Sequence, residues 1–182
     1  MAEPVSMELA RAQLRVDPDA AQDLLIEQAI VAAREWVERY TGHLLVRREV
    51  AEVFGSLSGT VDLHAWPNVE VTRVDYLAAD GNVTLDKSNY VVSPMQRPAQ
   101  LGLVAPSGWG QFGRAAAGAA TSSIVTVTMQ AGYAEDEVPG RLIRAMRLLI
   151  TDDFENRGDG DYSAKVIAAA ESICRSDRRV VV

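Results

Sequence analysis

The sequence predicts an α+β fold: a helical bundle of two N-terminal and two C-terminal helices, with a small antiparallel β module inserted between them. Apolar residues recur at helical spacing in residues 1–46 and 134–175, whereas short runs rich in β-branched residues fill residues 47–133. Leu, Ile, Val and Phe make up roughly a quarter of the chain, which is above the level typical of disordered sequences. A packed core is therefore expected.

The N-terminal region predicts two helices in succession. Ser6 can cap a first helix over residues 7–16. Asp17 and Pro18 then predict the N-cap and the first position of a second helix, because the fixed φ of proline suits that position. This second helix is expected to run to about residue 40.

The second helix carries two adjacent apolar stripes, and Gly42 is expected to end it. An apolar surface this wide predicts neighbours on two sides of the helix. The first stripe comprises Leu25, Ala29, Ala32, Trp36 and Tyr40, and the second comprises Ile26, Ile30, Ala33 and Val37.

The central region contains a series of short runs with the character of β-strands. Asp80-Gly81 between two such runs predicts a two-residue hairpin loop, because both central positions need a positive φ. Several strands at this spacing indicate a small antiparallel sheet or a sandwich. The predicted strands are residues 47–54, 61–63, 69–77, 83–85, 90–92, 101–104 and 124–129.

A long loop is predicted over residues 106–123, which are rich in Gly, Ala and Ser. Its residues 108–113 match the Gly-x-Gly-x-x-Gly pattern of dinucleotide sites, but the strand before it and the acidic residue after it are missing. The loop interpretation is therefore favoured. Within it, Trp109, Phe112 and Arg114 are predicted to contact a partner.

The C-terminal region predicts two further helices and a tail. Pro139 is expected at the first position of a helix that runs to about residue 155. Ser163 can cap a last helix over residues 164–174, and residues 176–182 form the tail.

Motifs for catalysis or cofactor binding are not found in the sequence. His43 and His64 each stand alone, at a helix end and a strand end, and are expected in turns or on the surface. Cys174 is the single cysteine, which excludes an internal disulfide and a cysteine-based zinc site. We therefore expect no enzyme activity, no cofactor and no metal.

The acidic run near the C-terminus is the nearest approach to a metal motif. Asp159, Asp161 and Ser163 copy the start of a calcium-binding loop. Ala164 and Ala170 stand where that loop needs a glycine and a bidentate glutamate. A solvated helix end and turn is the better interpretation.

Charge and hydropathy exclude several classes of protein. The net charge of -7 argues against nonspecific coating of nucleic acid. No apolar run approaches the ~20 residues that span a bilayer, and the first ten residues lack the features of a secretory signal. A soluble protein made inside the cell is expected.

Three arginines, Arg141, Arg144 and Arg147, recur at every third position on the side of their helix opposite its apolar face. They form either a solvated basic face, balanced by the acidic residues 135–137, or a face toward an acidic neighbouring subunit or DNA. The residues alone leave both interpretations open.

Five segments, in this order, resemble the head–tail connector (adaptor) proteins of tailed double-stranded DNA phages and related gene transfer agents. The resemblance spans about 150 residues, and it is carried by the order of the segments. The chain departs from the family pattern in the long loop and in its ending RRVVV. The segments are residues 5–16, 33–42, 69–81, 125–133 with Val138-Pro139, and 155–157.

The resemblance implies a structural virion protein of the neck, assembled in the bacterial host cytoplasm. Such proteins form a ring, usually a dodecamer, between the portal protein and a stopper or tail-completion protein. DNA passes through the axial channel without sequence-specific binding, and no membrane is involved. The acidic balance of this chain agrees with a conduit that repels phosphate.

The C-terminal tail is predicted to dock on the portal. Arg175, Arg178 and Arg179 concentrate positive charge that favours an acidic surface. The last three residues favour an extended strand, which can join the edge of a partner's sheet; a disordered tail is the alternative. These residues are Val180, Val181 and Val182.

Two other functions stay open at this point. One is a monomeric ligand- or carbohydrate-binding β module with helical flanks, and the other is a hydrolase with an unrecognised site. Oligomeric state distinguishes the connector from the monomeric binding module, because only the connector forms a ring.

Overall fold

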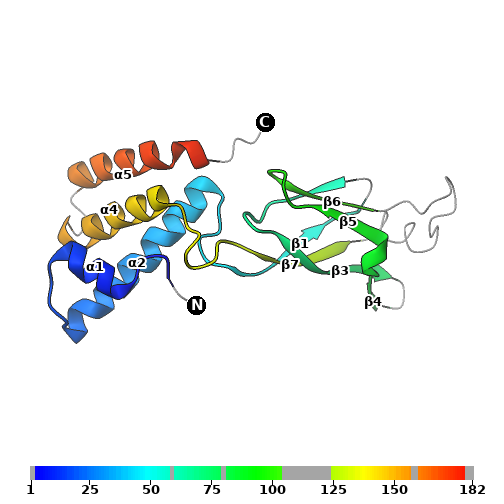
Figure 1. Cartoon of the computed structure of the whole chain (residues 1–182), viewed down its shortest axis with the longest axis horizontal. Helices are drawn as coiled ribbons and strands as arrows, with labels where there is room; N and C mark the ends of the chain where they lie inside the picture. The colour runs from blue at the N-terminus through cyan, green and yellow to red at the C-terminus, as the bar shows by residue number, and fades with distance from the viewer. Residues whose placement is uncertain (1–2, 58–59, 79–80, 104–123, 157–159, 179–182) are drawn as a thin grey trace. The chain divides into compact units, whose positions relative to one another are not determined.

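The computed structural model describes residues 3–57, 60–78, 81–103, 124–156 and 160–178. The chain divides into two compact units, Met1–Val46 with Tyr133–Val182, and Arg47–Gly132. We call them the helical unit and the β unit (Figure 1). The predicted α+β class is confirmed, with helices toward both ends of the chain and antiparallel strands inserted between them.

Two long helices, α2 and α4, lie side by side at the centre of the helical unit, where α1 packs against both and α5 packs mainly against α4 (Figure 1). A short 3-10 turn, η2, follows α5. The elements are α1 Met7–Leu14, α2 Ala20–Thr41, α4 Gly140–Asn156, α5 Gly160–Cys174 and η2 Arg175–Asp177.

An aliphatic core joins α2 to α4. The predicted second stripe of α2 is confirmed as its buried face. The first stripe is covered only in part, because Ala29 is buried and Trp36 is half-buried, whereas Leu25 is 45% exposed. The buried residues of the two helices include Ile26, Ile30, Ala33, Val37, Leu142, Met146 and Ile150.

The helix starts differ from the sequence expectation. The N-cap of α2 is Asp19, whose side chain accepts a hydrogen bond from the backbone N–H of Ala21 at 3.1 Å, so Asp17 and Pro18 precede the helix. Helix α5 begins at Gly160 rather than after Ser163, with Asp161 in its first turn. A carboxylate in the first turn interacts favourably with the positive N-terminal end of the helix dipole.

Local contacts confirm other predicted helix ends. Ser6 caps α1 by accepting a hydrogen bond from the N–H of Leu9 at 3.2 Å. Gly42 ends α2 with a φ of 73°, a left-handed conformation that glycine adopts without strain. Arg11 donates to both carboxylate oxygens of Asp23, at 2.8 and 2.6 Å, and so fastens α1 to α2.

The β unit consists of two antiparallel sheets with strand orders β1-β7-β3-β4 and β2-β6-β5. Burial alternates along β7, whose odd-numbered residues from Val125 to Ala131 are buried, as expected for a strand with one face in a core. The strands are β1 Arg48–Phe54, β2 Thr60–Leu63, β3 Glu70–Ala78, β4 Gly81–Thr84, β5 Tyr90–Ser93, β6 Ala99–Leu103 and β7 Val125–Ala131.

The predicted antiparallel pair exists, but Gly81 belongs to a strand rather than to the loop. Ala78 pairs with Gly81 across β3 and β4, so Gly81 begins β4 with a φ of 118° instead of occupying the loop centre. The predicted loop over residues 106–123 lies outside the described residues.

Candidate functional site

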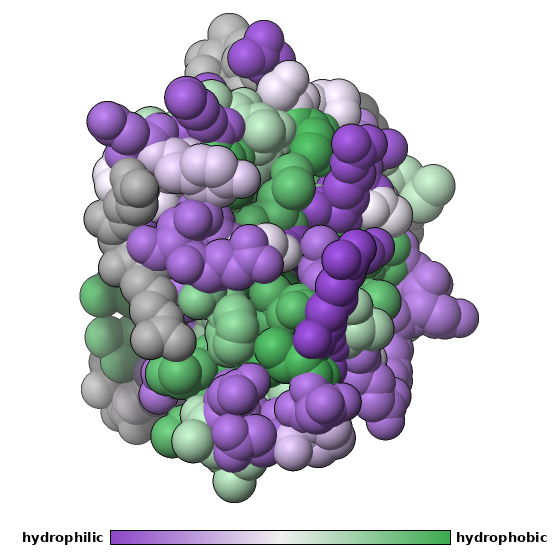
Figure 2. Space-filling model, turned by 90° about the vertical axis from the view of Figure 1, so that its left-hand side faces the viewer, coloured by the Kyte–Doolittle hydropathy of each residue, from purple (hydrophilic) through white to green (hydrophobic). Residues whose placement is uncertain are grey.

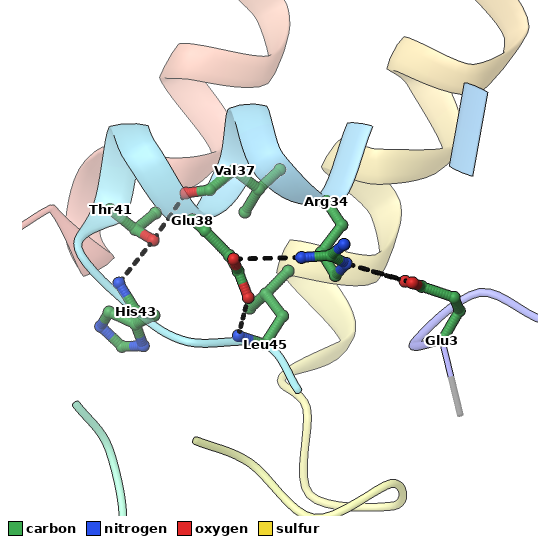
Figure 3. A network of polar contacts seen from close by, with 7 residues as sticks. All are labelled: Glu3, Arg34, Val37, Glu38, Thr41, His43 and Leu45. Atoms are coloured by element: carbon green, nitrogen blue, oxygen red, sulfur yellow. Dashed lines mark hydrogen bonds and ion pairs between the residues drawn. The ribbon is translucent and has the colours of Figure 1, made fainter. Parts of the chain in front are cut away.

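Polar contacts hold the C-terminal end of α2 and the chain that leaves it (Figure 3). Glu38 accepts hydrogen bonds from the guanidinium of Arg34 at 3.3 Å and from the backbone N–H of Leu45 at 2.8 Å. Arg34 also donates to the carboxylate of Glu3 at 3.0 Å. The N-terminal segment, α2 and the residues that lead to the β unit are thereby joined.

The two histidines have different environments. His43 is 4% exposed; its backbone N–H donates to Thr41, and its Nδ1 lies 2.8 Å from the hydroxyl of Tyr133. The prediction that His43 lies in a turn or on the surface is therefore wrong, because tertiary packing covers its ring. His64 is exposed as expected, with its Nδ1 3.2 Å from Glu52.

An ion pair fixes the turn that follows α5. Arg141 of α4 donates two hydrogen bonds of 2.5 Å to the carboxylate of Asp177, which is 4% exposed. These bonds hold the pKa of Asp177 below its usual value, against the opposing effect of burial, and raise the pKa of Arg141. Burial also raises the pKa of the neighbouring Cys174 thiol to about 11, so this thiol is unreactive at neutral pH.

A pocket of about 480 Å³ lies beside this turn, at the C-terminal end of α2. Trp36 and Tyr40 stack with their ring centroids 5.2 Å apart. The guanidinium of Arg178 lies 5.3 Å from the ring centroid of Tyr40, in cation–π geometry. The lining residues are Trp36, Arg39, Tyr40, Thr41, Gly42, Glu171 and Arg178.

The three arginines of α4 have different surroundings. Arg141 pairs with Asp177, Arg147 donates to the side-chain oxygen of Gln13 on α1, and Arg144 is exposed. Two of the three thus hold neighbouring elements. The sequence contained no signal for the partner role of Asp177, because the two residues meet only after α4, α5 and η2 have packed.

Of the predicted portal-contacting residues, the structure describes two. Arg175 is exposed in η2, and Arg178 lies over Tyr40. The other predicted contact residues lie outside the described part of the chain: Arg179, Val180, Val181 and Val182 of the tail, and Trp109, Phe112 and Arg114 of the loop.

Apolar side chains gather on the surface of the helical unit. Figure 2 looks at this unit from the left of Figure 1 and shows apolar side chains in the middle of the face, with hydrophilic ones around and between them. Leu24 and Leu25, in the first turns of α2, are 57% and 45% exposed. The other large exposed apolar residues described in this unit are Leu9, Tyr162 and Ile167.

Metal sites and membrane spans are absent from the described residues. These residues contain no group of three or more His, Cys, Asp or Glu side chains that could hold a metal ion. No helix in the same part of the chain has the length and apolar character needed to cross a membrane.

No family model and no curated protein matches the sequence. The fold matches that of chains in solved gene transfer agent particles. For the neck of an empty particle computed with C6 symmetry, the TM-score is 0.75 at 20% identity over 100% of this chain and 94% of that chain. For the neck of a native particle computed with C12 symmetry, it is 0.70 at 23% identity over the same shares of the two chains.

A chain from the virion of a native particle has a TM-score of 0.74 at 18% identity, over 98% of this chain and 91% of that chain. The fold is therefore one found in chains of virions. More particularly, this chain shares it with chains in the neck of gene transfer agent particles, and the resemblance seen in the sequence is confirmed at the level of the fold.

The ion pair between Arg141 and Asp177 leads to a stability prediction. We expect Arg141→Ala to lower the free energy of unfolding by about 2 kcal/mol, because it removes two charge-assisted hydrogen bonds from a buried carboxylate. Arg144→Ala, one turn away and exposed, should change it by less than about 0.5 kcal/mol. Urea unfolding followed by circular dichroism measures both, and equal losses would contradict the assignment.

The same pair predicts a pH dependence. Since the pKa of Asp177 is lowered in the folded state, its stabilising contribution is present above its unfolded pKa and is lost as the pH falls through the folded value. The difference in unfolding free energy between wild type and Arg141→Ala should be constant above about pH 5 and shrink below about pH 4. Asp177→Asn, which cannot titrate, is the control, and its difference from Arg141→Ala/Asp177→Asn should not show this decline on acidification.

Proposed function

We propose that this chain is a structural, non-enzymatic component of a virion neck: a head–tail connector that forms a ring between the portal protein and the stopper or tail. The observation that carries the proposal is the fold match to two chains in the neck of gene transfer agent particles. The match covers this whole chain and 94% of the length of each of those chains. A match of this extent includes both the helical unit and the β unit.

The chemistry of the chain supports an assembly role. Large apolar side chains are exposed on α2 and α5, as at the interfaces of subunits that associate. The negative net charge multiplies in an oligomer and gives a conduit that does not retain DNA phosphate. The C12 symmetry of one neck structure supports a ring of twelve copies, and the C6 symmetry of the other is compatible with it.

The contact with the portal is proposed for the C-terminal segment. The pairing of Asp177 with Arg141 and the stacking of Arg178 on Tyr40 hold the start of this segment against the helical unit. The basic charge of Arg175, Arg178 and Arg179 favours an acidic partner surface. The following valines supply residues that favour an added strand.

The ring is tested by measuring the mass of the assembly. Twelve copies of 19.7 kDa give about 236 kDa, and we expect mass photometry to detect this species, either alone or added to the mass of the portal protein from the same particle. A chain that stays monomeric both alone and with the portal would contradict the proposal and favour the monomeric binding module.

The tail is tested by deleting residues 179–182, a boundary chosen because Asp177 is buried. We expect helix content and melting temperature to stay unchanged and portal affinity to fall about tenfold or more. Added salt should also weaken the binding of the full-length chain to the portal. Lys165→Ala, which removes an exposed positive charge from α5, is the control. Unchanged portal affinity after the deletion would assign the contact to other residues.

A further inference from the structure

The exposed side of α2 is a shallow apolar groove. Leu24 is 57% exposed at its start, and Val31 and Ala32 continue it two turns later. Apolar residues gathered in this way on a helix surface mark a contact site. The groove is lined by Leu24, Glu27, Gln28, Val31, Ala32 and Glu35.

A second depression continues from this groove toward α4 and α5. Its floor is formed by Ala29, Ala32 and Ala33, whose small side chains let another chain approach closely, and Ile167 of α5 borders it. The two predicted stripes of α2 therefore differ in exposure, and the groove lies beside the first stripe and shares Ala32 with it. One stripe is buried within the chain, and much of the other stripe is open.

Acidic residues border the open surface of α2. Glu27 and Glu35 lie in the groove itself, and Asp152 and Asp153 of α4 line the second depression. An apolar surface with an acidic border favours a partner that presents apolar residues together with basic ones.

The outer face of α4 has the complementary chemistry. The first three turns of α4 contain no acidic residue. Of their three arginines, Arg141 is bonded to Asp177 and Arg147 to Gln13, so Arg144 is the one that faces outward. Arg144 is exposed on this face and the half-buried Leu148 lies one turn further on. The face thus combines positive charge with an apolar side chain.

The two surfaces point in opposite directions. Helices α2 and α4 pack against each other, and Ile30 and Met146 belong to their shared core, so the residues opposite them on each helix look away from the pair. On α4 these residues lie between the sides that contact α1 and α5. In a twelve-fold ring each copy is rotated by about 30° from the next, so the two contact faces of one copy must point nearly opposite ways. The outer faces of α2 and α4 meet this requirement, whereas a two-fold contact would use one face twice.

We infer that the outer face of α2, centred on Leu24, Gln28 and Glu35, binds the outer face of α4 around Arg144 in a second copy of this chain, head to tail. The inference rests on the proposed function, because it specifies the contact that closes the ring. The occupant of the groove on α2 is the next subunit.

Charge inversion tests the pairing with the full chain. Glu35→Arg on α2 and Arg144→Glu on α4 should each reduce the ring species about tenfold or more, because like charges then face each other. An equal mixture of the two variants should restore the ring, since alternating copies place opposite charges at every contact. The double variant should restore it as well.

Two controls accompany these variants. Glu49→Arg, which inverts an exposed charge on β1, should leave the ring unchanged. Circular dichroism should show wild-type helix content for each variant. Single variants that assemble like wild type, or a mixture that stays disassembled, would overturn the inference while leaving the proposed function intact if the wild type forms rings.

Crosslinking provides a measurement that does not need a stable ring. Gln28 is exposed on α2, and Gly140 at the start of α4 has open space around it. A chain with Gln28→Cys and Gly140→Cys, treated with a bifunctional maleimide, should give a ladder of covalent oligomers, whereas each variant with one added cysteine should not extend beyond dimers, since the native Cys174 is buried.

Each other crosslinking result overturns the inference. Absence of a ladder would exclude the head-to-tail contact, and efficient dimers from Gln28→Cys alone would show a two-fold contact through α2. If Glu35→Arg weakens portal binding and no ladder forms, the groove binds the portal instead. A wild-type chain that forms neither a ladder nor a ring with the portal would contradict the proposed function as well.

Discussion

The packing of α2 against α4 is the interaction on which the rest of the helical unit depends. It joins segments more than a hundred residues apart in the sequence and provides the surface on which α1 and α5 pack. The ion pair of Arg141 with Asp177 and the stacking of Arg178 on Tyr40 both attach the C-terminal segment to this central pair. Loss of the α2–α4 core would therefore disturb the attachment of α1, α5 and the C-terminal segment.

The helical unit uses its side chains for two purposes. Residues such as Met146 are fully buried and stabilise the single chain, whereas Leu24 and Leu25 leave much of their apolar surface in water. Exposing apolar side chains to water is unfavourable for an isolated protein, and covering them with another surface is favourable. The apolar surface left exposed on α2 is therefore the part of the helical unit that the proposed assembly would cover.

Much of the fold could be predicted from local sequence signals. The alternation of β7, the cap at Ser6 and the end of α2 at Gly42 each depend on a few neighbouring residues. The N-cap at Asp19 was not predicted, because Asp17-Pro18 carries a local signal for a helix start two residues earlier. The burial of His43 and the pairing of Asp177 depend on residues distant in sequence, and no periodicity encodes them.

The connections between the two units are themselves informative. Within the helical unit the backbone N–H of Tyr133 donates to the carbonyl of Leu44 at 3.2 Å, and within the β unit the ends of β1 and β7 pair through Arg48 and Ala131. The chain therefore leaves the helical unit and returns to it at neighbouring points. Replacing residues 47–132 with a short glycine-rich linker would close the helical unit at little entropic cost, so the β unit has the architecture of a removable insertion.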